Sequence, residues 1–285
     1  MELSARPTAA LFDGKTGYLV TLIPGIPGTE SKLSLFGAPG QKNVGLPGAA
    51  TSMTGNGDGV VYLASRGGYF AVDLASGAAT RTEVPGEAET EFTAIARRAD
   101  GGFVLGGADG TAFTLTADTQ VAEKAKNFAH VDVIVTVGDD AVVLDRGQTS
   151  VTALDSRGKP QQALRAGEGA TTMTSDPAGR VLVVDTRGGQ LLVFGVDPLI
   201  ERQAYPVSHA PYGLAGSSKL AWVSQTAANV VVGYDLATGI PVEKVRYPTV
   251  QQPDSLAYDE ASNTLYVVSG SGAGIQVIRN AAGAG

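Results

Sequence analysis

The sequence has no cysteine, one tryptophan and only two histidines among its 285 residues. Without cysteine, structural disulfides, thiolate nucleophiles and cysteine-ligated zinc are excluded. Two histidines supply little general-base material for hydrolase chemistry. No apolar run approaches the roughly 18 residues that a membrane-spanning helix requires. We therefore expect a chain without a metal site, without a cofactor and without a catalytic residue set.

Positive charge is also scarce. Lysine and arginine number 21 against 28 acidic residues, which gives a net charge of −7 and an isoelectric point near 4.9. Broad binding to nucleic acid or to anionic lipid depends on clustered Lys and Arg, so neither is expected here.

What is abundant is glycine, with 38 residues, together with short Thr- and Val-rich apolar runs separated by turn clusters. No long stretch has the 3.6-residue period of a helix, so the composition predicts an all-β fold. One apolar strand recurs seven times at intervals of roughly 40 residues, the spacing of a four-stranded propeller blade. Its equivalent positions are Val20, Tyr62, Val104, Val143, Val183, Trp222 and Tyr266.

The repeat predicts a single seven-bladed β-propeller spanning 1–285, each blade having strands a, b, c and d from the axis outward. The tryptophan, Trp222, falls on a strand b, where we expect it to be buried. The last repeat lacks a fourth strand, so the N-terminal segment should complete that blade and leave no open sheet edge. The expected blades are 8–46, 49–84, 91–124, 130–165, 169–206, 210–247 and 252–279 plus 2–7.

Residues 230–278 resemble the repeat of the YVTN or YncE-like propellers. In that family a strand ending in Asp-x-x-Thr-Gly is followed by a Pro-containing blade entry and a Tyr-Val-x-Asn-like strand. The runs Asp-Leu-Ala-Thr-Gly from Asp235, Pro-Asp-Ser-Leu-Ala from Pro253 and Leu-Tyr-Val-Val-Ser from Leu265 match these elements in order. The entry from His209 to Ala215 is a second copy. The Trp-Asp and Gly-His signatures of WD40 repeats are absent.

The resemblance implies an exported protein of the cell envelope, similar to an actinobacterial lipoprotein whose signal peptide and lipid anchor have been removed. The first ten residues have neither a basic region nor an apolar core, so no signal peptide is recognised there. Membrane attachment is expected only through such a removed anchor, and the protein is expected to be a monomer.

In a four-stranded blade the b–c and d–a loops lie on the same side, which makes that side the natural binding surface. Three b–c loops carry an arginine at nearly equivalent positions, and we predict that Arg66, Arg146 and Arg187 contact an anionic ligand or an acidic partner. The alternative is that these are exposed turn arginines paired with neighbours such as Asp145 and Asp185.

A second predicted set lies at the start of strand a, where side chains should form the mouth of the central channel: Thr51, Thr93, Asp132, Thr171, Tyr212 and Asp254. Two histidines lie just upstream, His130 and His209, and His209 and Tyr212 are included in the predicted binding set. A His/Asp metal site here has no supporting ligand spacing, so a polar, water-filled mouth is the preferred interpretation.

Two functions remain open from the sequence. The first is a non-catalytic binding or scaffold propeller that binds a protein or a small ligand on its loop side. The alternative is a channel-mouth enzyme of the lactonase, lyase or dehydrogenase type. The acidic loop with Glu87, Glu89 and Glu91 is interpreted as a solvated turn, because acids two residues apart in a Gly/Pro-flanked segment are rarely a catalytic pair.

Overall fold

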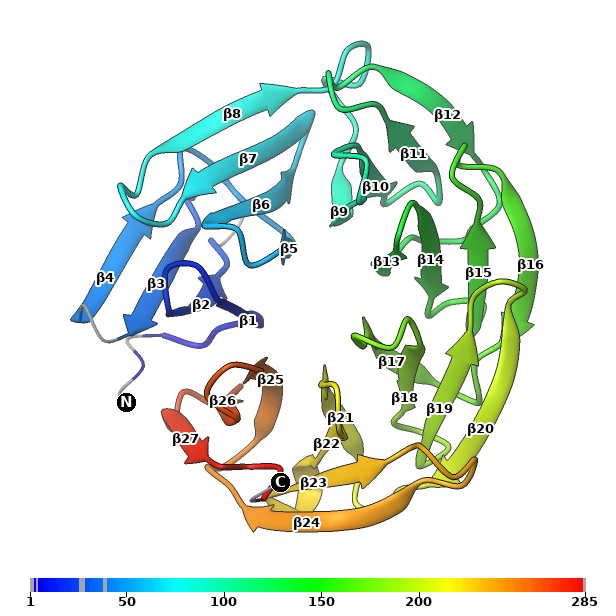
Figure 1. Cartoon of the computed structure of the whole chain (residues 1–285). Coiled ribbons are helices and arrows are strands. Elements are labelled where there is room, and N and C mark those ends of the chain that lie inside the picture. Colours follow the sequence, from blue (N-terminus) through cyan, green and yellow to red (C-terminus); the bar gives the residue numbers. More distant parts are fainter. Residues whose placement is uncertain (1–2, 4, 26–28, 38–39, 284–285) are drawn as a thin grey trace. The chain divides into compact units, whose positions relative to one another are not determined.

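A computed structural model of the chain describes residues 3, 5–25, 29–37 and 40–283. Over these residues the secondary structure consists of β-strands and one short 3-10 turn, η1 (Thr226–Ala228). The strands form consecutive antiparallel sheets in which sequence neighbours pair (Figure 1). The all-β fold class and the seven repeats predicted from the sequence are confirmed.

Each sheet corresponds to one repeat. We call the sheets blades 1 to 7 in chain order. Blade 1 contains β1 (Ala9–Asp13), β2 (Tyr18–Ile23), β3 (Lys32–Gly37) and β4 (Gly40–Gly45), and blade 2 contains β5 (Met53–Gly55), β6 (Val60–Ser65), β7 (Gly68–Asp73) and β8 (Ala79–Glu83). Blade 3 contains β9 (Phe92–Arg97), β10 (Phe103–Gly107), β11 (Ala112–Leu115) and β12 (Val121–Ala125), and blade 4 contains β13 (Val133–Val137), β14 (Asp140–Asp145), β15 (Ser150–Leu154) and β16 (Pro160–Arg165).

Blade 5 contains β17 (Ala170–Ser175), β18 (Val181–Asp185), β19 (Gln190–Gly195) and β20 (Ile200–Pro206). Blade 6 contains β21 (Pro211–Gly216), β22 (Ala221–Gln225), β23 (Val230–Asp235) and β24 (Val242–Pro248). Blade 7 contains β25 (Pro253–Asp259), β26 (Thr264–Ser269) and β27 (Ile275–Arg279).

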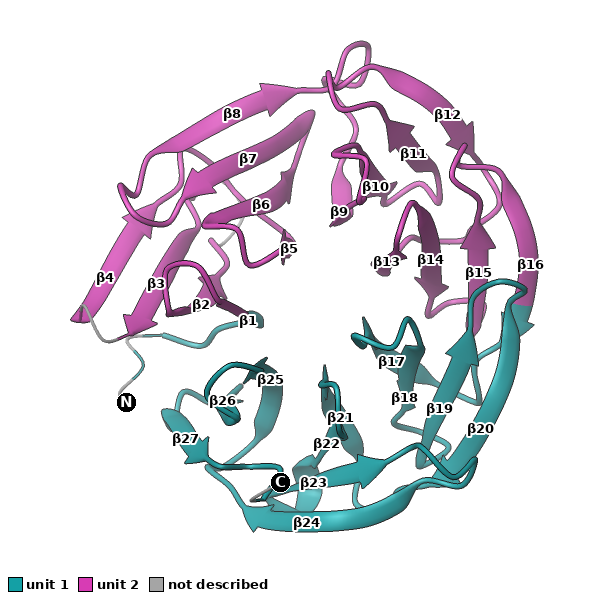
Figure 2. Cartoon of the chain, viewed as in Figure 1, with its two compact units in different colours: residues 1–10, 164–285 teal, residues 11–163 magenta. Residues whose placement is uncertain are grey.

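The chain divides into two compact units (Figure 2). Unit 2, residues 11–163, holds blades 1 to 4 except for residues 9–10 of β1 and residues 164–165 of β16. Unit 1, residues 1–10 and 164–285, holds blades 5 to 7. The single-domain organisation stays a prediction.

The segment predicted to complete blade 7 is described only in part, because residues 2 and 4 lie outside the described residues. Blade 7 has three strands in the described part of the chain, and residues 3 and 5–7 carry no strand assignment. Residues 1–10 nevertheless group with unit 1. Pro7 is buried, and the side chain of Arg6 lies beside Gly272 of blade 7.

The core of each unit is formed by the second and third strands of the blades. β18 and β22 are buried along their whole length, because other strands cover both of their faces. Trp222 on β22 is fully buried, as expected, and its ring stacks on Tyr258 with centroids 5.7 Å apart. The outer strands β20 and β24 are mostly exposed and carry the charged residues.

Aspartates stabilise hairpin turns that join a to b and c to d. The Asp13 carboxylate accepts hydrogen bonds from the backbone N–H and the hydroxyl of Thr16 at 2.8 and 2.7 Å. Asp73 accepts the same pair from Ser76, both at 2.7 Å. Gly77, which follows, has a φ of +79°, a conformation that glycine adopts without steric cost.

On the opposite side of the blades, the b–c loop is tied to the end of strand d by a recurring backbone hydrogen bond. A loop residue with positive φ supplies the carbonyl, and the chain leaving strand d supplies the N–H. The donor and acceptor residues are Val84 and Gly67, Phe128 and Gly110, Val207 and Gly189, and Thr249 and Asn229. The b–c and d–a loops of these blades therefore lie side by side, as the strand topology predicted.

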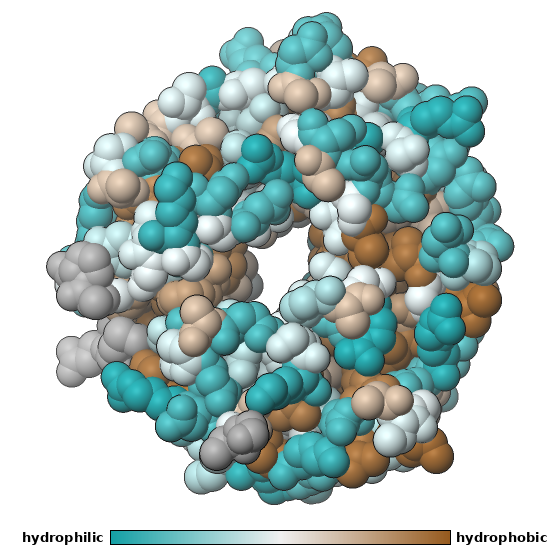
Figure 3. Space-filling model, in the orientation of Figure 1, coloured by the Kyte–Doolittle hydropathy of each residue, from teal (hydrophilic) through white to brown (hydrophobic). Residues whose placement is uncertain are grey.

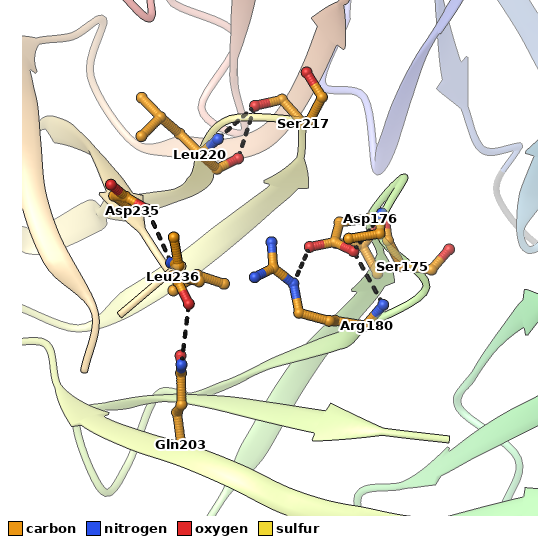
Figure 4. A network of polar contacts seen from close by, with 12 residues as sticks. Ser175, Asp176, Arg180, Gln203, Ser217, Leu220, Asp235 and Leu236 are labelled. Carbon is orange, nitrogen blue, oxygen red and sulfur yellow. Dashed lines mark hydrogen bonds and ion pairs between the residues drawn. The ribbon is translucent and has the colours of Figure 1, made fainter. Parts of the chain in front are cut away.

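Unit 1 contains a network of polar contacts between its blades (Figure 4). The buried Asp176 carboxylate accepts a hydrogen bond from Arg180 Nε at 2.7 Å, and Gln203 donates to the Leu236 carbonyl at 3.2 Å. The surface in Figure 3 intersperses hydrophilic and hydrophobic residues. Within the described residues, no helix has the length and apolar character needed to cross a membrane.

Candidate binding face

The residues predicted to line the channel mouth occupy one recurring structural position, an irregular place at or just before the start of strand a. In blade 3, Phe92 pairs with Gly107 and Ala94 with Gly106, so Thr93 is an extra residue. Thr171 and Asp254 are the extra residues of β17 and β25. A β-bulge of this kind re-aims its side chain away from the regular ladder, which explains why these positions could be aligned from the sequence.

The other three members of the set take the same place. Thr51 and Asp132 precede β5 and β13 and donate their N–H groups to the strand b residues Ala64 and Leu144, both at 3.0 Å. Tyr212 lies with Gly213 in the irregular stretch of β21 between Pro211 and Leu214. Unit 2 thus holds Thr51, Thr93 and Asp132, and unit 1 holds Thr171, Tyr212 and Asp254.

The threonines at this position connect neighbouring blades. The hydroxyl of Thr51 donates to the carbonyl of Phe92 in the next blade at 2.7 Å, and that of Thr93 donates to the carbonyl of Val131 at 2.6 Å. In unit 1 the adjacent Thr172 donates to the Tyr212 carbonyl at 2.5 Å. Much of the polarity predicted for the channel mouth is therefore used to join blade to blade.

Asp132 and Asp254 share the bulge position but differ in their surroundings. Asp132 Oδ2 accepts the backbone N–H of Arg146 at 2.8 Å, and its Oδ1 lies 3.2 Å from His130 Nδ1. Asp254 has no hydrogen-bond donor or cation on its carboxylate anywhere in the described chain. Burial alone raises the pKa of Asp254 above the ordinary aspartate value.

Two carboxylates that the sequence suggested as partners for arginines have another role. Asp145, at the end of β14, is fully buried and accepts the N–H groups of Ala129 at 2.6 Å and Gln148 at 2.9 Å. These donors belong to the d–a and b–c loops of blade 4. The Asp145 carboxylate therefore fixes both loops.

Asp185, at the end of β18, does the same in blade 5. It is fully buried and accepts N–H groups from Glu168, Gly169 and Gly188 at 2.7, 2.9 and 2.8 Å. A Cβ on Gly188 would lie 2.1 Å from the carboxylate, so glycine is required at that place. We did not predict this role from the sequence. The available signal was an aspartate at the end of strand b followed by a Gly-containing turn.

The three predicted arginines fall into two groups. Arg66 forms an exposed ion pair with Glu89, as the alternative interpretation expected of a turn arginine, although with a different partner. Arg146 and Arg187 are exposed, and their side chains make no ion pair or hydrogen bond with any described residue. Whether the three bind a ligand together stays a prediction.

His130 and His209 lie in d–a loops, and Tyr212 lies near the start of β21. His209 is exposed and has a φ of +64°, followed by Ala210 at +51°, and its Nδ1 lies 2.7 Å from the Ser208 hydroxyl. Tyr212 is half-buried. Among the described residues, no three His, Asp or Glu side chains are grouped so that they could hold a metal ion.

Unit 2 also has a cavity of about 350 Å³ between the d–a loop that enters blade 3 and the b–c loop of that blade. Its lining residues are Glu89, Thr90, Glu91, Ala108 and Asp109. The acidic turn of the sequence therefore borders a cavity, which the spacing of its glutamates alone did not indicate. Glu87 of the same loop is not among the lining residues, and its carboxylate pairs with Lys124 and accepts the Thr90 hydroxyl at 2.6 Å.

Comparison with known proteins gives the fold. No protein-family model matches the chain, and no curated protein matches it. Many solved structures resemble it, and three of those that do so over most of its length illustrate the range. Virginiamycin B lyase from Staphylococcus aureus is 13% identical, with a TM-score of 0.76 and coverage of 95% of each chain.

A chain of the mitotic checkpoint complex is 10% identical, with a TM-score of 0.80, over 98% of this chain and 90% of that one. The WD40 repeats of RRP9 are 10% identical, with a TM-score of 0.77, over 94% and 88%. At such identities the likeness concerns the fold. The chain is a seven-bladed β-propeller, a fold that these comparisons find both in a lyase and in WD40 proteins.

Proposed function

We propose that the chain is a non-catalytic binding propeller that uses its b–c and d–a loops to bind a protein or a small ligand. One observation carries this proposal. The buried carboxylates of Asp145 and Asp185 fix the backbone of both loops, while the arginine that follows each of them in the b–c loop stays exposed and unpaired among the described residues. A loop backbone that is fixed before binding loses little conformational entropy when a partner arrives.

The chemistry of these loops selects the partner. A guanidinium has five N–H donors in a planar fork that matches a carboxylate or a phosphate. The chain has a net charge of −7, and Arg146 and Arg187 place positive charge on its loops. We infer that they bind acidic side chains of a protein or an anionic small molecule.

The proposal is tested with the double variant Arg146→Ala/Arg187→Ala beside Arg157→Ala/Lys219→Ala, which removes the same charge from exposed turns on the opposite side of the blades. Each protein is used as bait in a cell-envelope extract, and any captured partner is then titrated in purified form. Binding retained by wild type and the control but reduced at least about tenfold in the arginine variant supports the proposal. Equal binding by all three contradicts it.

Location and family are part of the same proposal. The likeness of residues 230–278 to the YVTN or YncE-like repeat supports a member of that family that is exported to the cell envelope as a lipoprotein. Fractionation of the native host with an antibody against the chain tests this. Recovery in the cytosolic fraction would contradict it.

The alternative function is an enzyme that uses the start of strand a. Asp254 favours it, because a carboxyl whose pKa is raised by burial holds its proton more tightly and is a candidate for proton transfer. Virginiamycin B lyase, one of the proteins with this fold, gives the first reaction class to assay. Turnover lost in Asp254→Asn and kept in Asp132→Asn would favour the enzyme over the binding module.

A further inference from the structure

We propose that Asp254, at the bulge of β25, binds a primary ammonium group, supplied by a lysine side chain of a protein partner or by a small amine. The site deepens the proposed function, since it lies on the same loop side of unit 1. It is nevertheless independent of the arginines in its chemistry, because it takes a cation where they take an anion.

The first observation is the unused carboxylate. No donor or cation of the described chain contacts the half-buried carboxylate of Asp254, so its oxygens are available to an external donor. The bulge itself does not need the charge, because threonine occupies the same position in blades 3 and 5.

The second observation is the close packing around the carboxylate. A Cβ on Gly270, in the b–c loop of blade 7, would lie 1.9 Å from Asp254 Oδ2. A Cβ on Gly213, in the neighbouring blade 6, would lie 3.0 and 3.1 Å from the carbonyl oxygens of Pro253 and Asp254. Glycine at position 270 lets the b–c loop close on the carboxylate, and glycine at position 213 lets blade 6 approach the backbone of the bulge. One side of the carboxylate is therefore covered by backbone, and a ligand reaches it from the remaining exposed side.

The third observation is the contrast with blade 4. There the equivalent Asp132 has an internal donor, the N–H of Arg146. In blade 7 the equivalent N–H belongs to Gly270, and it donates instead to the carbonyl of Gln252 at 2.8 Å. The redirected N–H leaves the Asp254 carboxylate without the bond that satisfies Asp132. An external donor can take its place.

The ligand class follows from this setting. A carboxylate that has lost part of its hydration gains most from a positively charged donor. An ammonium group is a compact charge with three donors and fits an approach that is half covered by backbone, whereas the wide guanidinium fork requires more open space. Burial already raises the pKa of Asp254, and a bound cation would lower it again.

The experiment uses the full chain and follows the backbone N–H resonances of Gly270 and Ser271 by NMR at pH 7.5. The probes are propylammonium and Nα-acetyl-lysine amide, with propanol and Nα-acetyl-norleucine amide as neutral counterparts of similar size. We expect saturable shifts with the two ammonium probes, at dissociation constants on the order of 1 mM, and none with the neutral compounds.

Two variants and a control locate the site. Asp254→Asn keeps the shape and removes the charge, and it should weaken ammonium binding at least about tenfold. Gly270→Ala should do the same by displacing the carboxylate. Asp132→Asn is the matched control and should bind as wild type does. Absence of saturable shifts in wild type, or equal affinity in a folded Asp254→Asn, overturns the proposal.

The two sources of the ammonium group are separated by comparing the probes. Binding of a lysine-containing peptide about tenfold tighter than propylammonium identifies a protein partner, and equal affinities identify a small amine. The variant Arg146→Ala/Arg187→Ala should leave ammonium binding unchanged. If the arginine-dependent partner is retained while no ammonium probe binds, this inference fails and the proposed function stands.

Discussion

Blades 4 and 7 use the same positions on their loop side in different ways. In blade 4, Asp132 and Asp145 both accept backbone N–H groups, so every carboxylate at the strand ends contributes to holding the loops. In blade 7 the residue equivalent to Asp145 is Ser269, which is fully buried and accepts the N–H groups of Ser271 and Ala273. There Asp254 is left without an internal partner in the described chain. The difference separates carboxylates that the fold requires from one that it does not.

This contrast predicts first that Asp145→Ala is strongly destabilising. The substitution removes the buried acceptor of N–H groups from two loops, and we expect a loss of about 3 kcal/mol in the free energy of unfolding. Ser269→Ala, its counterpart in blade 7, should cost about 1 kcal/mol. Urea titrations followed by circular dichroism measure both. Equal losses in the two variants would break the comparison.

Asp132→Ala should have the next largest effect. It removes the acceptor of the Arg146 N–H and should cost about 1 to 2 kcal/mol. Asp254→Ala removes no hydrogen bond within the described chain, so its effect should stay within about 0.5 kcal/mol. The two variants, unfolded in parallel at pH 7, test the assignment directly. A larger loss in Asp254→Ala would show that this carboxylate has a structural partner after all.

The threonines that share the bulge position give an intermediate case. Thr93→Val keeps the shape of the side chain but removes the hydroxyl that bonds the Val131 carbonyl, with an expected loss of about 1 kcal/mol. Thr186 lies in the b–c loop of blade 5, not at the bulge, and Thr186→Val, which deletes its bond to the Pro211 carbonyl, should behave similarly. Thermal unfolding by calorimetry is the measurement. Unchanged stability in both variants would mean that these bonds contribute nothing net.

The smallest expected effect is the pH dependence of Asp254. Because burial raises its pKa in the folded state, the folded protein binds a proton more tightly than the unfolded chain does. Stability from this group therefore falls as the pH rises from the ordinary aspartate value through the raised one. Asp254→Asn should flatten this part of the profile and be slightly more stable than wild type at pH 7. Parallel profiles for the two proteins would contradict the prediction.

Much of this fold could be predicted from the sequence because its repeat is local. The strand b runs, the Asp- and Gly-containing turns and the interval between repeats are set by residues close together in the chain, and each indicates the same blade. The bulge positions from Thr51 to Asp254 were aligned for the same reason. Arg66, Arg146 and Arg187 were found on their loops, but the pairing of Arg66 with Glu89 depends on a contact across 23 residues.

The sequence by itself determined the number and type of blades, the all-β class and the polar character of the loop side, because alternation and turn chemistry act over a few residues. Only the tertiary structure decided which carboxylates accept hydrogen bonds from the chain itself. Asp145 and Asp185 are buried against N–H groups up to 17 residues away, and Asp254 is not. The physical reason is that a carboxylate's role depends on the donors around it. Those donors come from loops that strand pairing and blade packing bring together.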